Sequence, residues 1–102
     1  MDNLIIPQKE IDSLCRKYNF KELSIFGLFL RDDFNEKSDI DLLYTFHDNN
    51  KYGLFDIIRI KKELENIFGR NVDFVSRKAV ERSRNIYRKK AILKNTKVIY
   101  TA

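Results

Sequence analysis

The apolar positions near the start of the chain follow the period of an α-helix. Four of them lie at the i, i+3, i+4 and i+7 spacing: Ile11, Leu14, Cys15 and Tyr18. This spacing predicts an amphipathic helix over residues 7–19. Pro7 suits its first turn, where a missing N–H is not needed for a helical hydrogen bond.

The rest of the chain alternates between strand-like and helix-like patterns. Short apolar runs predict strands over 23–26, 39–46, 72–75 and 98–100. Helices are predicted over 28–33, over 54–68 with Gly69 as its stop, and after residue 76 with a break near 83–85. This order predicts a single α/β domain over 1–102, a small mixed sheet of about four strands with helices packed on it.

Composition supports an ordered domain and bears on its location. Hydrophobic residues make up 43% of the chain and aromatic residues 13%, which argues against a disordered chain. No apolar run approaches the roughly 18 residues of a membrane helix, and the first residues lack the pattern of a signal peptide. A lone cysteine, Cys15, is interpreted as a core residue and favours a reducing compartment. We therefore expect a cytoplasmic protein that does not contact a membrane.

The net charge of +5 is unevenly distributed. Residues 1–75 hold 11 Lys/Arg against 14 Asp/Glu, whereas residues 76–102 hold nine Lys/Arg against one acid, Glu81. The densest basic positions are Arg82, Arg84, Arg88, Lys89 and Lys90. They could bind an acidic protein partner, contact nucleic acid, or form a solvated helix face. Nucleic acid is the weaker of the two binding hypotheses, because no base-reading motif or aromatic platform accompanies the charge.

Three aspartates form the candidate chemical centre. Asp39 and Asp41 begin a predicted strand, and side chains two residues apart in a strand point to the same face. Two such carboxylates repel each other unless a cation lies between them, and Mg²⁺ prefers oxygen ligands of this kind. Asp73 lies inside another apolar strand. Three acids on neighbouring strands could hold two metal ions, although an acid-x-acid pair alone is often only solvated.

A second group of residues suits phosphate. Gly27 closes the first predicted strand and lets the backbone approach a phosphate closely, and Arg31 adds a positive charge. The alternative is that Gly27 is only a turn and Arg31 a surface residue.

These motifs resemble the minimal nucleotidyltransferases of the DNA polymerase β superfamily. Phe26-Gly27-x-x-x-Arg31 is followed by Ser38-Asp39-Ile40-Asp41-Leu42 and later by Val72-Asp73. The family motif is Gly-Ser, ten residues, then Asp-x-Asp, and here ten residues separate Leu28 from Asp39. The resemblance spans nearly the whole chain. The chain departs from the family at Leu28, which stands where the family has Ser.

The resemblance implies an antitoxin that moves AMP from ATP onto a tyrosine of a partner HEPN ribonuclease toxin. It implies that Asp39 and Asp41 bind two Mg²⁺ ions, that Asp73 completes the metal site and helps to deprotonate the acceptor, and that Gly27, Leu28, Arg31 and Ser38 lie at the triphosphate. Losing the Ser hydroxyl would remove a hydrogen bond to a charged group, worth about 1.5–3 kcal/mol, so we expect weakened activity. Two alternatives stay open: a non-catalytic antitoxin that acts by binding, and a transferase acting on a small-molecule hydroxyl.

Overall fold

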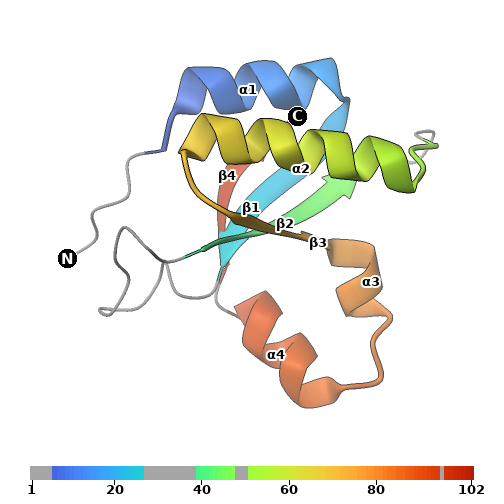
Figure 1. The fold of residues 1–102 in the computed structure, drawn as a ribbon. Coiled ribbons are helices and arrows are strands. Elements are labelled where there is room, and N and C mark those ends of the chain that lie inside the picture. The colour runs from blue at the N-terminus through green and yellow to red at the C-terminus, as the bar shows by residue number, and fades with distance from the viewer. Residues whose placement is uncertain (1–5, 27–38, 48–50, 95) are drawn as a thin grey trace.

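The computed structural model describes residues 6–26, 39–47, 51–94 and 96–102. The elements follow the predicted alternation of helices and strands (Figure 1). In chain order they are α1 (Gln8–Lys17), β1 (Phe20–Phe26), β2 (Ile40–Phe46), α2 (Leu54–Phe68), β3 (Val72–Ser76), α3 (Arg77–Glu81), α4 (Ile86–Lys94) and β4 (Thr96–Thr101). The predicted helix over 28–33 lies outside the described residues.

The four strands form one mixed sheet in the order β3-β2-β1-β4. β1 lies antiparallel to both of its neighbours, β2 and β4, whereas β2 and β3 run parallel. The parallel pair is joined by α2, which gives the long crossover that parallel strands need. The predicted α/β fold with a mixed sheet of about four strands is confirmed.

Helices cover both faces of the sheet (Figure 1). α1 and α2 pack on one face over the main cluster, in which Ile11, Leu42 and Leu64 are among the buried members. α3 and α4 pack on the other face over a smaller cluster. Its buried residues are Phe26, Leu43, Val80 and Ile92. Successive side chains of β2 therefore serve opposite layers, as the strand period of two requires.

Local signals in the sequence explain where the elements begin and end. Asn19, at a φ of 61°, forms the turn between α1 and β1. α2 ends at Gly69, whose φ of 70° is the left-handed conformation that glycine adopts without strain. The predicted break near 83–85 separates α3 from α4, and the Asn85 side chain accepts a hydrogen bond of 3.1 Å from the N–H of Arg88.

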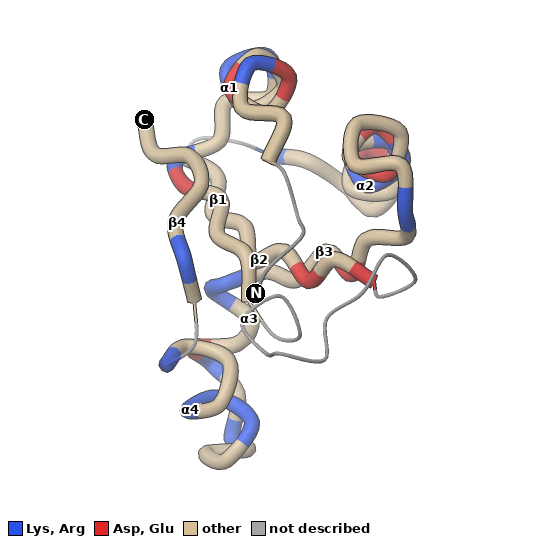
Figure 2. Tube along the Cα trace, turned by 90° about the vertical axis from the view of Figure 1, so that its left-hand side faces the viewer, with Lys and Arg blue, Asp and Glu red and all other residues tan. Residues whose placement is uncertain are grey.

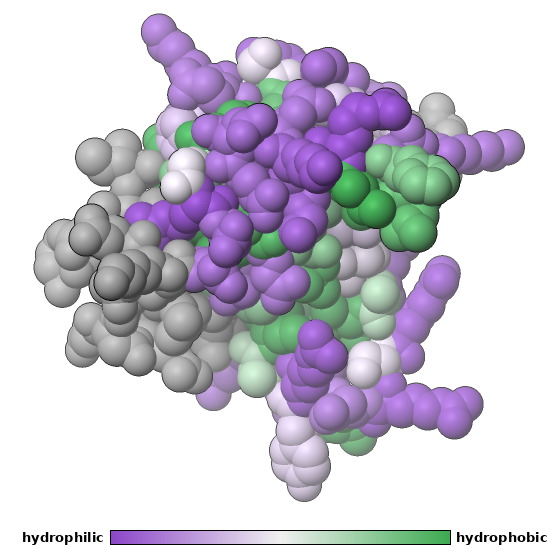
Figure 3. Space-filling model, in the orientation of Figure 1, coloured by the Kyte–Doolittle hydropathy of each residue, from purple (hydrophilic) through white to green (hydrophobic). Residues whose placement is uncertain are grey.

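Burial confirms the interpretation of Cys15 as a core residue and leaves part of the apolar surface of α2 exposed. Cys15 is fully buried, and burial raises the pKa of its thiol to about 12, as expected of an inert core residue. Within α2, however, Leu54 and Ile58 are exposed, together with Phe55, while Ile60 is fully buried. Figure 3 shows the resulting apolar patch at the right-hand end of α2. None of the helices in the described ranges is long and apolar enough to cross a membrane.

Candidate functional site

The parallel pairing of β2 with β3 brings two of the three candidate aspartates together. Asp41 is the register partner of Asp73. Partner residues on adjacent parallel strands point to the same face, with backbones about 4.8 Å apart. The N–H of Ile40 donates a hydrogen bond of 2.9 Å to the carbonyl oxygen of Asn71, which ties the first residue of β2 to the residue before β3. Asp39 lies one residue before β2 and is exposed.

The aspartate pair lies on the face of the sheet that α3 and α4 cover. Leu42 belongs to the main cluster under α1 and α2, whereas Leu43 belongs to the smaller cluster on the other side. Asp41 is two residues from Leu43, and Asp73 is two residues from Val75, which packs against the same smaller cluster. Figure 2 shows acidic positions in red on the strands around β2 and β3, and basic positions in blue along α4.

Exposure changes one step of the sequence argument. The sequence places Asp73 inside an otherwise apolar strand, and a charge buried in such a strand would need a partner. Asp73 is exposed, because it is the second residue of β3, an edge strand of the sheet. Asp41, on the inner strand β2, is half-buried. Burial therefore does not by itself require a cation at Asp73, and the case for one rests on the pairing of the two carboxylates.

The two carboxylates suit a hard cation whose remaining ligands come from a substrate and from water. Within the described ranges, no three His, Cys, Asp or Glu side chains lie close enough together to hold a metal ion. Mg²⁺ is nevertheless usually held by only one or two carboxylates, with water and substrate phosphates as its other ligands. Asp41 and Asp73 supply two such carboxylates where the adjacent strands β2 and β3 begin. The residues present therefore fit Mg²⁺ accompanied by a phosphate group.

The residues predicted to hold the triphosphate are Gly27, Leu28, Arg31 and Ser38, and all four lie outside the described residues. β1 ends at Phe26, and Phe26 is the antiparallel register partner of Asp41. The last residue of β1 therefore lies directly beside the half-buried aspartate of the candidate metal site.

The basic positions predicted from the sequence gather on and before α4. Arg82, Arg84, Arg88 and Lys90 are exposed, whereas Lys89 is partly buried. We refer to residues 82–94 as the basic segment. Arg88 and Lys89 also line a pocket of about 150 Å³, whose other walls are Val75, Ala79, Val80, Ser83 and Ile92. Sequence reasoning missed this pocket because it forms only when α3 and α4 pack on β3.

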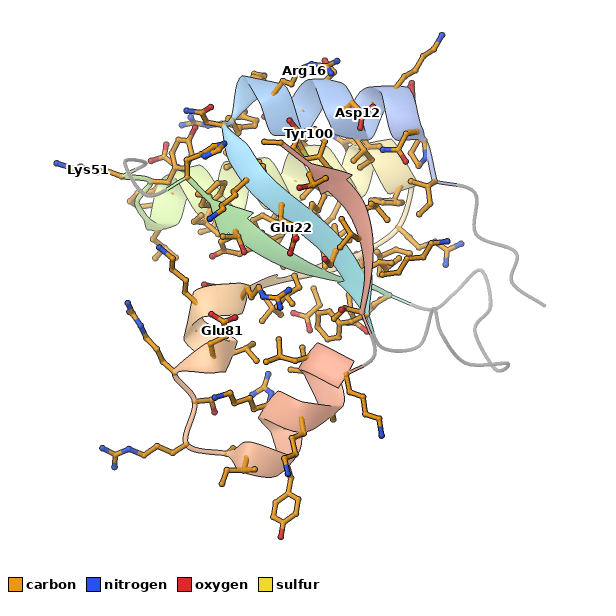
Figure 4. All side chains as sticks on the ribbon, turned by 180° about the vertical axis from the view of Figure 1, so that it is seen from behind. Asp12, Arg16, Glu22, Lys51, Glu81 and Tyr100 are labelled. Atoms are coloured by element: carbon orange, nitrogen blue, oxygen red, sulfur yellow. The ribbon has the colours of Figure 1, made fainter. Side chains whose placement is uncertain are left out.

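An ion-pair network holds α3 on the face that carries the aspartates. The Arg77 guanidinium lies 3.2 Å from the Glu22 carboxylate on β1 and 3.1 Å from the Glu81 carboxylate on α3. Figure 4 labels Glu22 on the sheet and Glu81 on the neighbouring helix. These side chains are about one-third to one-half exposed, so the pairs contribute modestly to stability. Their effect is to fix the position of α3 relative to the sheet.

Comparison with known proteins gives the geometry a family context. Residues 8–99 match the model of the nucleotidyltransferase domain family. A Methanocaldococcus jannaschii protein, assigned as a protein adenylyltransferase, is 34% identical over 87 residues, which cover 85% of this chain and 84% of the relative.

Solved structures agree with this result. A protein assigned as a minimal nucleotidyltransferase superposes with a TM-score of 0.66 at 28% identity, covering 88% of this chain and 86% of its own. A Shewanella oneidensis complex of a tri-AMPylated HEPN toxin with its MNT antitoxin contains a chain that matches with a TM-score of 0.61 at 14% identity, over 93% of this chain and 70% of that one. At that identity the likeness shows the fold alone. The match over residues 8–99, together with the 34% identical relative, shows that this chain belongs to the nucleotidyltransferase domain family.

Proposed function

We propose that this chain transfers AMP from ATP to a tyrosine hydroxyl of a HEPN ribonuclease toxin and so neutralises the toxin. Two findings support the proposal: a relative assigned as a protein adenylyltransferase, and a similar fold in an MNT antitoxin bound to a tri-AMPylated HEPN toxin. The single cysteine of this chain, Cys15, is buried and free, which suits a reducing compartment. We therefore propose the cytoplasm as the location of this chain.

The observation that carries the proposal is the Asp41–Asp73 register pair. In the proposed reaction the acceptor oxygen attacks the α-phosphorus of ATP, the bond from that phosphorus to the bridging oxygen breaks, and pyrophosphate leaves. Two Mg²⁺ ions, held by the carboxylates of the Asp-x-Asp motif, would neutralise the charge of the phosphates.

The three aspartates would then divide two roles between them. Asp39 and Asp41 would hold the metal against the triphosphate, and Asp73 would complete the site and take the proton of the acceptor hydroxyl. Gly27, Leu28, Arg31 and Ser38 would hold the triphosphate, and the pairing of Phe26, the last residue of β1, with Asp41 supports this proposal. Positioning and charge neutralisation dominate catalysis of this kind, so a small scaffold is sufficient.

The basic segment would hold the partner. Its exposed cations suit an acidic surface of a toxin, since complementary charge speeds association and fixes orientation. Replacing Arg84, Arg88 and Lys90 together by Gln should weaken partner binding and reduce its salt dependence. The matched control replaces three exposed cations of α1 and α2, on the other face of the sheet, by Gln: Lys9, Arg16 and Lys62. Equal binding by the two triple variants would contradict a docking role for the basic segment.

A second candidate is a non-catalytic antitoxin that neutralises by binding alone. Leu28 favours it, because the family Ser at that position would help to hold the triphosphate. The two functions differ in whether AMP becomes attached to the toxin.

The deciding experiment incubates the chain with Mg²⁺, ATP labelled in the α-phosphate, and a candidate HEPN partner protein. The transferase proposal expects label on a toxin tyrosine, and loss of that label when Asp39 and Asp41 are both replaced by Asn. A toxin that is bound and silenced without label would support the binding-only function. Label that persists with the double variant would refute the metal role of the aspartates.

A further inference from the structure

We propose that Tyr87 is itself an AMP acceptor, modified by a second copy of this chain. The inference rests on the proposed transferase function and extends it to the chain's own surface. It begins from the exposure of Tyr87, whose side chain is 89% accessible in the first turn of α4.

Tyr87 differs from the other four tyrosines of the chain, all of which lie in the described ranges. The Tyr18 hydroxyl donates to the Glu63 carboxylate, and the Tyr52 hydroxyl donates to the Tyr18 carbonyl oxygen at 2.9 Å. The Tyr44 ring stacks on Phe74 with centroids 4.1 Å apart, and Tyr100 packs against the main cluster. Tyr87 is therefore the tyrosine whose hydroxyl a second molecule can reach most freely.

The surroundings of Tyr87 favour both the approaching nucleotide and the modified product. Arg84 and Arg88 are exposed close to it in the chain, and they attract a triphosphate. Esterification by AMP places a phosphodiester anion beside the first turn of α4, where the helix dipole and nearby arginines stabilise negative charge. The Asn85 side chain accepts the hydrogen bond from the Arg88 N–H, which fixes this turn.

The chemical step is the one proposed for the partner, with Tyr87 as the acceptor. The Tyr87 phenolic oxygen forms a bond to the α-phosphorus of ATP, and the bond from that phosphorus to the bridging oxygen breaks. Pyrophosphate carries away the electron pair of the broken bond, and the phenolic proton passes to Asp73 of the copy that acts as the enzyme. No oxidant, reductant or further reactant is needed.

Transfer takes place between copies because of where Tyr87 lies. Asp41 and Asp73 lie where β2 and β3 begin. α4 begins away from the sheet, at the bottom of Figure 1, and returns toward the sheet at its C-terminal end.

Modification would add negative charge and bulk to the basic segment, and so it would weaken the attraction of that segment for an acidic partner.

The test incubates the purified chain with Mg²⁺ and ATP labelled in the α-phosphate, without any partner. The proposal expects label on the wild type, located at Tyr87 by mass spectrometry, and loss of label in Tyr87→Phe. Tyr100→Phe, a half-buried tyrosine changed in the same way, serves as the matched control and should keep the label. Label that persists in Tyr87→Phe, or that maps to another residue, overturns the proposal.

A mixture of two variants tests transfer between copies. Tyr87→Phe keeps the proposed catalytic aspartates, whereas the Asp39→Asn, Asp41→Asn double variant keeps Tyr87. Labelled ATP and Mg²⁺ should place AMP on the double variant, which a size tag distinguishes. If the wild type labels a HEPN partner but never Tyr87, the further inference fails while the proposed function stands. If neither the partner nor the chain is labelled, both fail.

Discussion

Replacing Asp73 by Asn should have opposite effects on stability with and without nucleotide. The register pairing places the Asp41 and Asp73 carboxylates on one face, on strands about 4.8 Å apart. Two unit charges about 5 Å apart repel by about 3 kcal/mol at an effective dielectric constant of about 20. Asp73 is exposed, so solvent screening reduces this to about 1 kcal/mol or less.

Removing one charge should therefore stabilise the metal-free protein. For a domain of this size, about 1 kcal/mol raises Tm by roughly 4–8 °C, and the expected gain is at most that. With Mg-ATP the wild type should become the more stable of the two proteins. A ligand that binds only the folded state stabilises it more when it binds more tightly. Each tenfold loss of affinity removes about 1.4 kcal/mol of that stabilisation.

The assay is thermal unfolding of the wild type and Asp73→Asn, with and without Mg-ATP. Asp12→Asn is the matched control, because Asp12 lies on α1, over the other face of the sheet (Figure 4). Asn keeps an oxygen that can accept the hydrogen bond from the Gln8 side chain. We expect the control to respond to Mg-ATP like the wild type. An equal Mg-ATP response in Asp73→Asn and the wild type would refute the metal-site reasoning.

Three further predictions follow from named residues. Leu28→Ser should raise nucleotide affinity or transfer rate by about tenfold or more, following the hydrogen-bond magnitude for a charged group; equal Mg-ATP thermal shifts in both proteins would show that the hydroxyl is dispensable. Burial raises the pKa of the Cys15 thiol to about 12, so the native thiol stays protonated while the unfolded one ionises from about pH 8.5, and stability is lost as pH rises. In urea unfolding between about pH 8 and 10.5, the wild type should therefore lose stability with pH faster than Cys15→Ala, by up to about 1.4 kcal/mol per pH unit, and parallel pH profiles would contradict this. Leu64→Ala should lower the free energy of unfolding by about 2–5 kcal/mol because Leu64 is fully buried, whereas the exposed Lys62→Ala should change it little; similar losses in both would be inconsistent with the packing described.

Periodicity predicted the elements well where a strong local signal marks their ends. The helix over 54–68 begins and ends as predicted, since Gly69 adopts the left-handed conformation that stops it. The first strand was predicted to begin at Leu23 but begins at Phe20. Its register with β2 shifts between Phe20 and Glu22, and an irregularity of that kind breaks the alternation on which strand prediction depends. Strand order likewise follows from tertiary packing, so β4 pairing with β1 was not predictable.

The candidate site was predictable in part. Alternation along the sequence indicated that Asp39 and Asp41 share a face, but the neighbour of Asp41 could be identified only from the parallel register with Asp73. The exposure of Asp73 was missed because the sequence does not reveal that β3 is an edge strand. The apolar spacing predicted the helix α2 but not which of its apolar residues are buried: Ile60 and Leu64 are buried, whereas Leu54 and Ile58 are exposed.

The most direct test of the transferase account asks whether neutralisation of the toxin outlasts contact with this chain. The HEPN partner is incubated with the chain, Mg²⁺ and ATP, separated from the chain under denaturing conditions, refolded and assayed for RNA cleavage. A mock-treated toxin carried through the same steps controls for refolding. If this chain is a transferase, the treated toxin stays inactive and carries AMP on a tyrosine, whereas treatment with the Asp39→Asn, Asp41→Asn double variant leaves it active. Full recovery of RNA cleavage after treatment with the wild-type chain would contradict the account.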